Sequence, residues 1–271
     1  MASARVVGYS VVAGCVVLGL AAASRFMARE ARSASQFVPA LASSPPSDSD
    51  AIVRVYAARA SGWHGIFGVH TWVAVRPAEA TEYTIYEVIG WRVRYGSPAV
   101  VIHSRIPDAK WFGAKAELIA EQRGPQAAEL IAQIDNAAQT YPWSNRYRIW
   151  PGPNSNTFVA WIARAVPGIG VDLPSTAIGK DYLGSSVIAI APSGRGVQFS
   201  LFGLIGLIAS PLEGLEINML GLTFGLNPYR WTLKLPIVGI LAFGRSLPAL
   251  SDGALQPALI PAALAKPSSE L

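Results

Sequence analysis

The chain has few charged residues and almost no cysteine. Asp, Glu, Lys and Arg make up 14% of its 271 residues, whereas an average soluble domain contains roughly 25%. The single cysteine, Cys15, lies in an apolar N-terminal stretch. The rest of the chain therefore has no internal disulfide, no thiolate metal ligand and no catalytic thiol. With 51% hydrophobic residues, the composition indicates a membrane-associated or deeply buried protein.

The sequence lacks the residues that nucleic-acid binding and metal or cofactor binding need. The net charge is +5, but the basic residues are scattered and form no run with interleaved aromatics, so we expect no nucleic-acid binding. The three histidines have no Asp or Glu at metal-ligand spacing, and the glycines show no phosphate-loop spacing. We therefore expect neither a metal nor a cofactor.

Residues 1–32 contain an apolar run that is long enough to cross a bilayer. Residues 6–24, about 19 in number, carry no charge and lie between Arg5 and Arg25, which suits one transmembrane helix. A retained signal anchor and a cleaved signal peptide both fit this segment. The positive-inside rule would place the body in the cytoplasm, because most flanking arginines follow the run. An envelope function instead favours a single-pass protein whose body faces the periplasm, and the sequence leaves this orientation open.

The remaining chain divides by composition into four parts. Residues 33–50 are rich in Ser, Ala and Pro and are expected to form a flexible linker. Residues 51–195 are expected to form an α+β core in which helices pack against an antiparallel sheet. Residues 196–245 are glycine-rich and apolar, and they predict a β meander that packs on the core or faces a membrane. Residues 246–271 are rich in Ala, Pro and Ser and are expected to be disordered.

Alternating apolar residues predict several strands in the core. They lie at about 52–57, 67–76, 83–93 and 98–104, and the short connection between the second and third indicates an antiparallel hairpin. In the register that places Trp72 opposite Glu87, the diagonal neighbour of Glu87 is His70, whereas a slip by one residue would put Glu87 on the other face. Long side chains can meet across such a diagonal.

Two helical regions are predicted after these strands. Residues 113–141 are expected to form two helical pieces, the second beginning at Pro125. A further helix follows the Pro-Gly-Pro run at 151–153, because an apolar stripe begins at Phe158. Asn154, Ser155 or Asn156 is then its N-cap, the place where many enzymes hold a nucleophile, although these residue types commonly only cap a helix.

Four motifs together carry a family resemblance. They occupy residues 63–72 (WHGIFGVHTW), 86–91 (YEVIGW), 151–158 (PGPNSNTF) and 177–182 (AIGKDY). They resemble one bacterial family of membrane-anchored proteins that is known only as a domain of unknown function. The resemblance extends over roughly residues 52 to 240, and the PGPNSNTF run is its most specific part. It implies little about activity.

A more distant resemblance implies a chemistry. A strand His, followed after a helix by an Asn-led motif that opens another helix, resembles the circularly permuted papain-like proteins of the NlpC and lecithin:retinol acyltransferase types. It implies a permuted papain-like fold for residues 51–195. His70 would then be the base, Glu87 its orienting carboxylate and Ser155 the nucleophile, where the family has Cys. The implied cleft-lining and oxyanion-hole residues are Asn154, Asn156, Trp72, Lys180 and Asp181.

The exchange of Cys for Ser155 leaves two functions open. A serine needs strong base assistance to act as a nucleophile, so the first hypothesis is a hydrolase or acyltransferase on an amide or ester of the cell envelope. It requires the Ser155 hydroxyl to lie within about 5 Å of the His70 ring. The alternative is a non-catalytic envelope protein, either an assembly factor or a ligand-binding module. In both hypotheses the N-terminal helix contacts membrane lipid, and the partner is an envelope substrate or protein.

Overall fold

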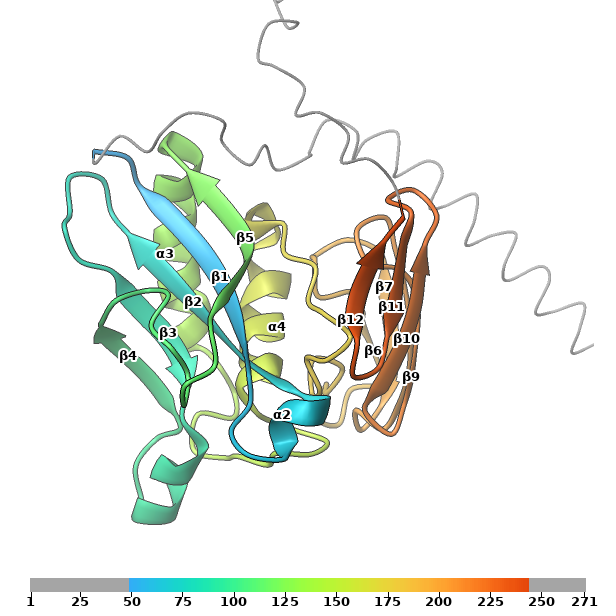
Figure 1. Ribbon diagram of the computed structural model, residues 1–271. Helices are drawn as coiled ribbons and strands as arrows, with labels where there is room; N and C mark the ends of the chain where they lie inside the picture. Colours follow the sequence, from blue (N-terminus) through green and yellow to red (C-terminus); the bar gives the residue numbers. More distant parts are fainter. Residues whose placement is uncertain (1–48, 244–271) are drawn as a thin grey trace, which may run out of the picture.

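The computed structural model describes residues 49–243, which form two antiparallel sheets with helices between them (Figure 1). The expected N-terminal anchor, nearly all of the expected linker and the expected disordered tail lie outside the described residues. Within residues 49–243, no helix is both long and apolar enough to span a membrane. The expected combination of α-helices and antiparallel sheet is confirmed, and most of the ordered structure is β.

The first sheet has five strands in the order β4-β3-β2-β1-β5, all antiparallel. Its strands are β1 (Ile52–Arg59), β2 (Val69–Arg76), β3 (Thr84–Val88), β4 (Val100–Ser104) and β5 (Glu117–Arg123). Two short helices connect strands at the same end of this sheet. They are α2 (His64–Phe67), between β1 and β2, and the 3-10 helix η1 (Gly90–Tyr95), between β3 and β4.

Three predicted elements are corrected by the structure. The expected strand at 67–76 begins only at Val69 because α2 precedes it, and the expected strand at 83–93 ends at Val88 because η1 follows. The first helical piece expected after residue 113 is wrong, since residues 117–123 form β5 and pair with β1. Ala, Leu and Glu in this segment favour a helix, but such propensities are weak and pairing with a neighbouring strand overrides them.

Helices α3 (Pro125–Gln139) and α4 (Ser155–Ala165) pack on one face of the first sheet. The predicted start of α3 at Pro125 is confirmed, and the second helix begins where the apolar stripe indicated. The short 3-10 helix η2 (Pro167–Ile169) follows α4. Together these elements cover the main core, which includes Val73, Val75, Phe158 and Ile162.

The two faces of β2 therefore have different neighbours. Thr71, Val73 and Val75 point toward α4, and the Thr71 hydroxyl donates a hydrogen bond to the Asn156 side-chain oxygen at 2.9 Å. Because side chains alternate along a strand, His70, Trp72 and Ala74 point to the other face. There Trp72 and Ala74 form a second, smaller core that includes Ala116 and packs against Trp111.

The second sheet is a seven-stranded meander in the order β12-β11-β10-β9-β8-β7-β6. Its strands are β6 (Ile188–Ile190), β7 (Val197–Leu201), β8 (Ile205–Ser210), β9 (Gly214–Met219), β10 (Leu222–Asn227), β11 (Thr232–Leu235) and β12 (Gly239–Ala242). β6 lies before the boundary expected at residue 196 and forms one edge of this sheet. Figure 1 shows α4 between the two sheets.

The second sheet has a polar inner face and an apolar outer face. Buried side chains that point inward are Gln198, Ser200, Ser210, Glu216, Asn218, Thr223 and Lys234, whereas exposed ones that alternate with them are Val197, Phe199, Leu207, Ile217, Phe224 and Leu226. An antiparallel sheet with one solvated face normally has the reverse pattern. Ile208 on β8 is buried, but most of the other large hydrophobic side chains of this sheet do not contribute to the core of their own chain.

Candidate functional site

The first cluster of predicted site residues lies on the face of the first sheet that is turned away from α4. β2 and β3 pair in the register that the sequence predicted, with Val73 opposite Tyr86. This register brings the His70 ring to Glu87, with 3.1 Å between His70 Nε2 and Glu87 Oε2. His70 and Glu87 are both buried, so a diagonal pair inferred from strand alternation is present in the fold.

The Glu87 carboxylate is held by more groups than the sequence indicated. His103 Nε2, on β4, lies 2.7 Å from Glu87 Oε1, and Arg105 Nη2 lies 3.4 Å from Glu87 Oε2. Burial alone would raise the pKa of Glu87, but the bonds from His70 and His103 and the charge of Arg105 lower it to about 2. Burial lowers the pKa of His70. The neutral His70 ring therefore donates its Nε2–H to an ionised carboxylate.

Aromatic rings cover this cluster. The His70 ring stacks on Trp111 with 3.7 Å between ring centroids and lies 5.6 Å from Trp72. The Arg105 guanidinium lies over the Trp72 ring at 5.1 Å, and the Trp72 indole donates a hydrogen bond to the Pro107 carbonyl. His70 is 6% exposed, and its bond to Glu87, together with that of His103, joins β2, β3 and β4, so we interpret the cluster as a structural clamp between these strands.

A change in pH should report this clamp. The ordinary pKa of Glu87 is 4.5 and the folded one is about 2, so the carboxylate stabilises the fold above pH 4.5, and that contribution disappears as the pH falls toward 2. We expect Glu87→Gln to remove up to about 3 kcal/mol at pH 7 and to flatten the dependence of stability on pH over this window. Thermal unfolding between pH 7 and 2 measures both effects. Glu82→Gln, on an exposed residue beside β3, should keep the dependence seen for the unaltered protein, and an unchanged slope in Glu87→Gln would contradict the assignment.

Ser155 is not part of this cluster. It begins α4, and its backbone carbonyl lies 3.4 Å from the Thr71 hydroxyl, which places it on the helix-covered face of the sheet. His70 points to the opposite face. The expected approach of Ser155 to His70 is therefore wrong, because the strand alternation puts Thr71 rather than His70 toward the helix N-terminus. Among residues 49–243, none forms a hydrogen bond with the Ser155 hydroxyl.

Asn154 and Asn156 anchor the start of α4. The Asn154 side-chain oxygen accepts hydrogen bonds from the backbone N–H groups of Asn156 and Thr157, and its amide donates to the carbonyls of Ile149 and Ile178. The Asn156 amide donates to the carbonyls of Val69 and Ile178. These bonds use both amide groups, which leaves neither free to stabilise an oxyanion.

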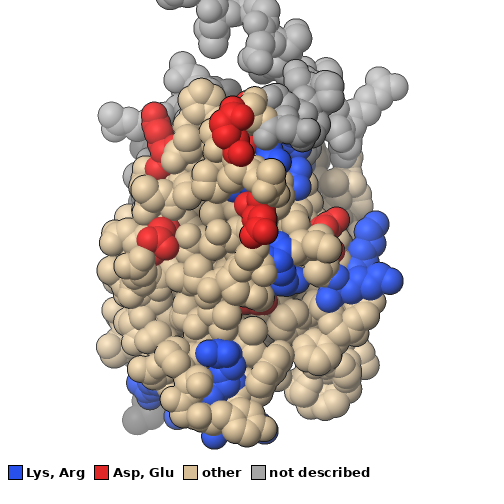
Figure 2. Space-filling model, turned by 90° about the vertical axis from the view of Figure 1, so that its left-hand side faces the viewer, with Lys and Arg blue, Asp and Glu red and all other residues tan. Residues whose placement is uncertain are grey.

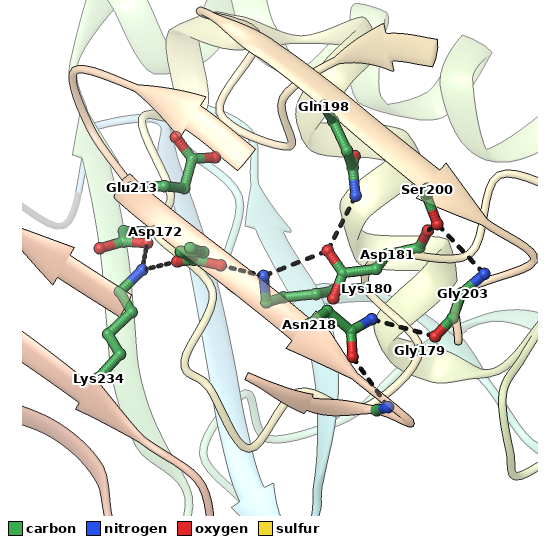
Figure 3. Close-up of polar contacts among 12 residues, drawn as sticks. Asp172, Gly179, Lys180, Asp181, Gln198, Ser200, Gly203, Glu213, Asn218 and Lys234 are labelled. Carbon is green, nitrogen blue, oxygen red and sulfur yellow. Dashed lines mark hydrogen bonds and ion pairs between the residues drawn. The ribbon is translucent and has the colours of Figure 1, made fainter. Parts of the chain in front are cut away.

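Lys180 and Asp181 belong to a second cluster, a buried chain of charges against the inner face of the second sheet (Figure 3). The Lys180 ammonium lies 2.5 Å from Glu216 Oε2 and 3.5 Å from Asp181 Oδ1. Glu216 also pairs with Lys234, which in turn pairs with Asp172. At the other end, the Gln198 amide donates to Asp181 at 2.8 Å. The chain thus links the loop after η2 to β7, β9 and β11.

The charges in this chain stabilise one another. Burial alone would lower the pKa of Lys180, but the carboxylates of Asp181 and Glu216 raise it. Burial alone would raise the pKa of Glu216, but Lys180 and Lys234 lower it. Lys180, Glu216 and Lys234 are therefore all ionised in a site where each is about 1% exposed. Each of these groups is already paired, so the chain ties the sheet to the core rather than presenting a reactive group.

Sequence reasoning missed two of the four polar residues in the first cluster, His103 and Arg105, and most members of the second. His103 lies on β4 and Arg105 directly follows it, so both come after the β2–β3 hairpin in the sequence. Only the pairing of β3 with β4 brings them to Glu87. Glu216 lies within an apolar region of the sequence, where nothing local marks it as the partner of two lysines. The available signal was the alternation at 215–219, which indicates a half-buried strand but not which of its faces is buried. The described residues contain no group of His, Cys, Asp and Glu arranged to hold a metal ion.

Comparison with known proteins identifies one similarity. Residues 50–182 match a family described as "Protein of unknown function (DUF3750)". This supports the resemblance to a domain of unknown function that the motifs indicated, and the matched segment contains the first sheet and both long helices. No curated protein and no solved structure matches the chain.

Proposed function

We propose that this chain is a non-catalytic, membrane-tethered assembly module of the cell envelope, and that its second sheet is the assembly surface. The observation that carries the proposal is the outer face of this sheet, which is apolar and exposed although the inner face is polar and buried. A serine hydrolase is no longer supported, because Ser155 and His70 lie on opposite faces of the first sheet. The tether is the apolar run at residues 6–24 of the sequence.

The outer face forms a continuous apolar row across five strands. Strand pairing places Ile188 beside Phe199, Phe199 beside Leu207, Leu207 beside Ile217 and Ile217 beside Phe224. All five are exposed. Seven strands about 4.8 Å apart, with about five residues of ~3.3 Å each, make a face of roughly 500 Å² in projection. Because side chains protrude from the sheet, the accessible surface area of this face is larger than its projection. It approaches the ~800 Å² that each partner buries in a standard protein interface.

A second copy of this chain is the occupant that fits this face best. Two twisted antiparallel sheets pack face to face about 10 Å apart, with their apolar side chains interdigitated. Such packing leaves the edge strands β6 and β12 in water, where their unpaired backbone groups can be solvated. Lipid tails would not satisfy those groups, which is why open sheets do not enter the hydrocarbon region.

The oligomeric state of the full-length protein tests this proposal. In mild detergent, light scattering should give the mass of a dimer, and Leu207→Lys combined with Ile217→Lys should give a monomer with an unchanged circular dichroism spectrum, because both side chains point outward. Ile106→Lys changes an exposed apolar residue away from the second sheet and should leave the dimer intact.

Two results would overturn the proposal. The first is a dimer that persists in the double variant. The second is a monomeric protein that begins to self-associate only when residues 246–271 are deleted, because the chain's own C-terminal segment would then be the occupant of the outer face.

A further inference from the structure

One end of the molecule combines exposed aromatic residues, arginines and no acidic residues. We call it the basic–aromatic end. It comprises residues 59–68, 89–98 and 142–153, together with the three hairpin turns at Phe202, Leu220 and Ile237. In Figure 1 this end includes α2 and the connection between β3 and β4, both at the bottom of the view. It is distinct from the outer face of the second sheet.

Hydrogen bonds show that these segments adjoin one another. The Ala99 backbone N–H donates to the Ser144 carbonyl at 2.7 Å, which joins the segment after η1 to the loop before α4. The Trp150 indole donates to the Leu220 carbonyl at 2.9 Å. The Arg59 guanidinium donates to the Ile237 carbonyl, also at 2.9 Å. Both sheets therefore contribute to one continuous surface.

The apolar part of this surface is made of side chains that the fold leaves open. Exposed aromatic rings come from each of the three long segments and from one turn, and they are Trp63, Phe67, Trp91, Tyr95, Trp150 and Phe202. Phe202, Leu220 and Ile237 are exposed at hairpin tips and have positive φ values of 54°, 55° and 67°. Apolar residues with side chains are uncommon in this conformation, which favours Gly and Asn.

The charged part of the surface has one sign. The three long segments contain five arginines, Arg59, Arg92, Arg94, Arg146 and Arg148, and no Asp or Glu. None of the five forms an ion pair with another residue in the range 49–243, and the bonds of Arg59 go to neutral carbonyls. Figure 2 views the molecule from one side, with the acidic side chains in its upper and middle parts and only basic ones toward its lower end.

We propose that the basic–aromatic end docks on the anionic headgroups of a lipid bilayer. Trp and Tyr are enriched at membrane–water interfaces, where their rings lie among the headgroups. Arginines near the surface add attraction to anionic lipids. An acidic protein would match the charge, but it would not account for apolar side chains at the tips of three separate turns. The bilayer is thus the occupant that both features favour.

The part of the chain before Ser49 permits this arrangement. Twenty-four residues, 25–48, separate the apolar run from the first described residue, and an extended chain of that length spans up to ~80 Å. β1 has eight residues and is therefore roughly 27 Å long. A protein held by residues 6–24 can accordingly turn either end of the first sheet toward the same membrane.

A fluorescent reporter on the full-length protein tests the docking. In a Cys15→Ser background, an environment-sensitive dye is attached at Tyr95→Cys, within the basic–aromatic end, or at Gln126→Cys, an exposed residue at the opposite end of the sheet. The protein is reconstituted in vesicles of phosphatidylcholine alone or with 30% phosphatidylglycerol. We expect a blue shift and increased intensity at position 95 only with phosphatidylglycerol, and no change at position 126.

Charge removal provides the decisive comparison. The side chains of Arg94, Arg146 and Arg148 are exposed, so replacing all three with Gln should leave the fold intact. The replacement should weaken docking at least about ten-fold, as should 0.5 M salt for the unaltered protein. An equal response in both vesicle types, an equal response at position 126, or no response at position 95 would overturn the proposal. The mass of the dimer is measured separately, so failure here is distinguishable from failure of the assembly surface.

Discussion

A Glu216→Gln variant is expected to lose about 3–5 kcal/mol of stability, because it removes two buried hydrogen bonds between charged groups, each worth about 1.5–3 kcal/mol. Glu216 pairs with both Lys180 and Lys234, so the change leaves two buried ammonium groups without their shared carboxylate. Each kcal/mol shifts the melting temperature of a domain of this size by about 2–4 °C. The midpoint of thermal unfolding should therefore fall by roughly 10 °C.

Glu129→Gln is the matched control for this change. Glu129 is an exposed residue on α3, and the same substitution there should alter stability by no more than about 0.5 kcal/mol. Replacing Glu216 and Lys180 together by Met should be less harmful than Glu216→Gln alone, because it removes charges of both signs. If Glu216→Gln unfolds at the same temperature as the control, the chain of charges does not hold the second sheet to the core.

The second large effect is expected at the start of α4. Asn154→Ala should cost about 2–4 kcal/mol, because it removes an N-cap and leaves the Ile149 carbonyl without its side-chain donor, whereas the Ile178 carbonyl keeps the Asn156 amide. Ser155→Ala should cost less than about 1 kcal/mol, because the Ser155 hydroxyl has no hydrogen-bond partner among the described residues. Urea unfolding of the two variants measures this difference at adjacent positions.

The same pair of positions separates a structural role from a catalytic one. An activated serine reacts with a phosphonate probe, and this reaction needs its base. We expect no covalent labelling of Ser155 in the unaltered protein. Labelling of Ser155 that disappears in His70→Ala would instead require the two residues to meet, which contradicts their placement on opposite faces of the first sheet.

The predicted and observed positions of Ser155 and His70 show what a sequence pattern can and cannot determine. Alternation along β2 and β3 gave the diagonal contact between His70 and Glu87 only with an assumed register, and the structure has that register. It could not determine which face of β2 is covered by α4. Each face carries residues that suit a core, Val73 and Val75 on one and Trp72 and Ala74 on the other. The choice depends on packing between segments that are about 85 residues apart.

The second sheet illustrates the same limitation on a larger scale. Its glycines and apolar residues predicted a β meander over residues 196–245, and β7 to β12 form one within that range. The usual assumption that the apolar face of a sheet is the buried one would place the wrong face of this sheet against the core. The polar face is buried because Glu216 pairs there with Lys180 from the loop after η2 and with Lys234 from β11. Neither pairing can be inferred from local sequence.

The accessibility of the outer face in the assembled protein tests the central claim most directly. In a Cys15→Ser background, Ile217→Cys places a thiol at the middle of the apolar row, and Ile106→Cys provides a reference; these residues are 47% and 70% exposed in a single copy. If the face is covered by a second copy, the thiol at position 217 should react with a maleimide at least about ten-fold more slowly than the reference. Leu207→Lys should restore its reactivity. Equal reaction rates at the two positions in the unaltered assembly would contradict the account, because the outer face would then be open to solvent.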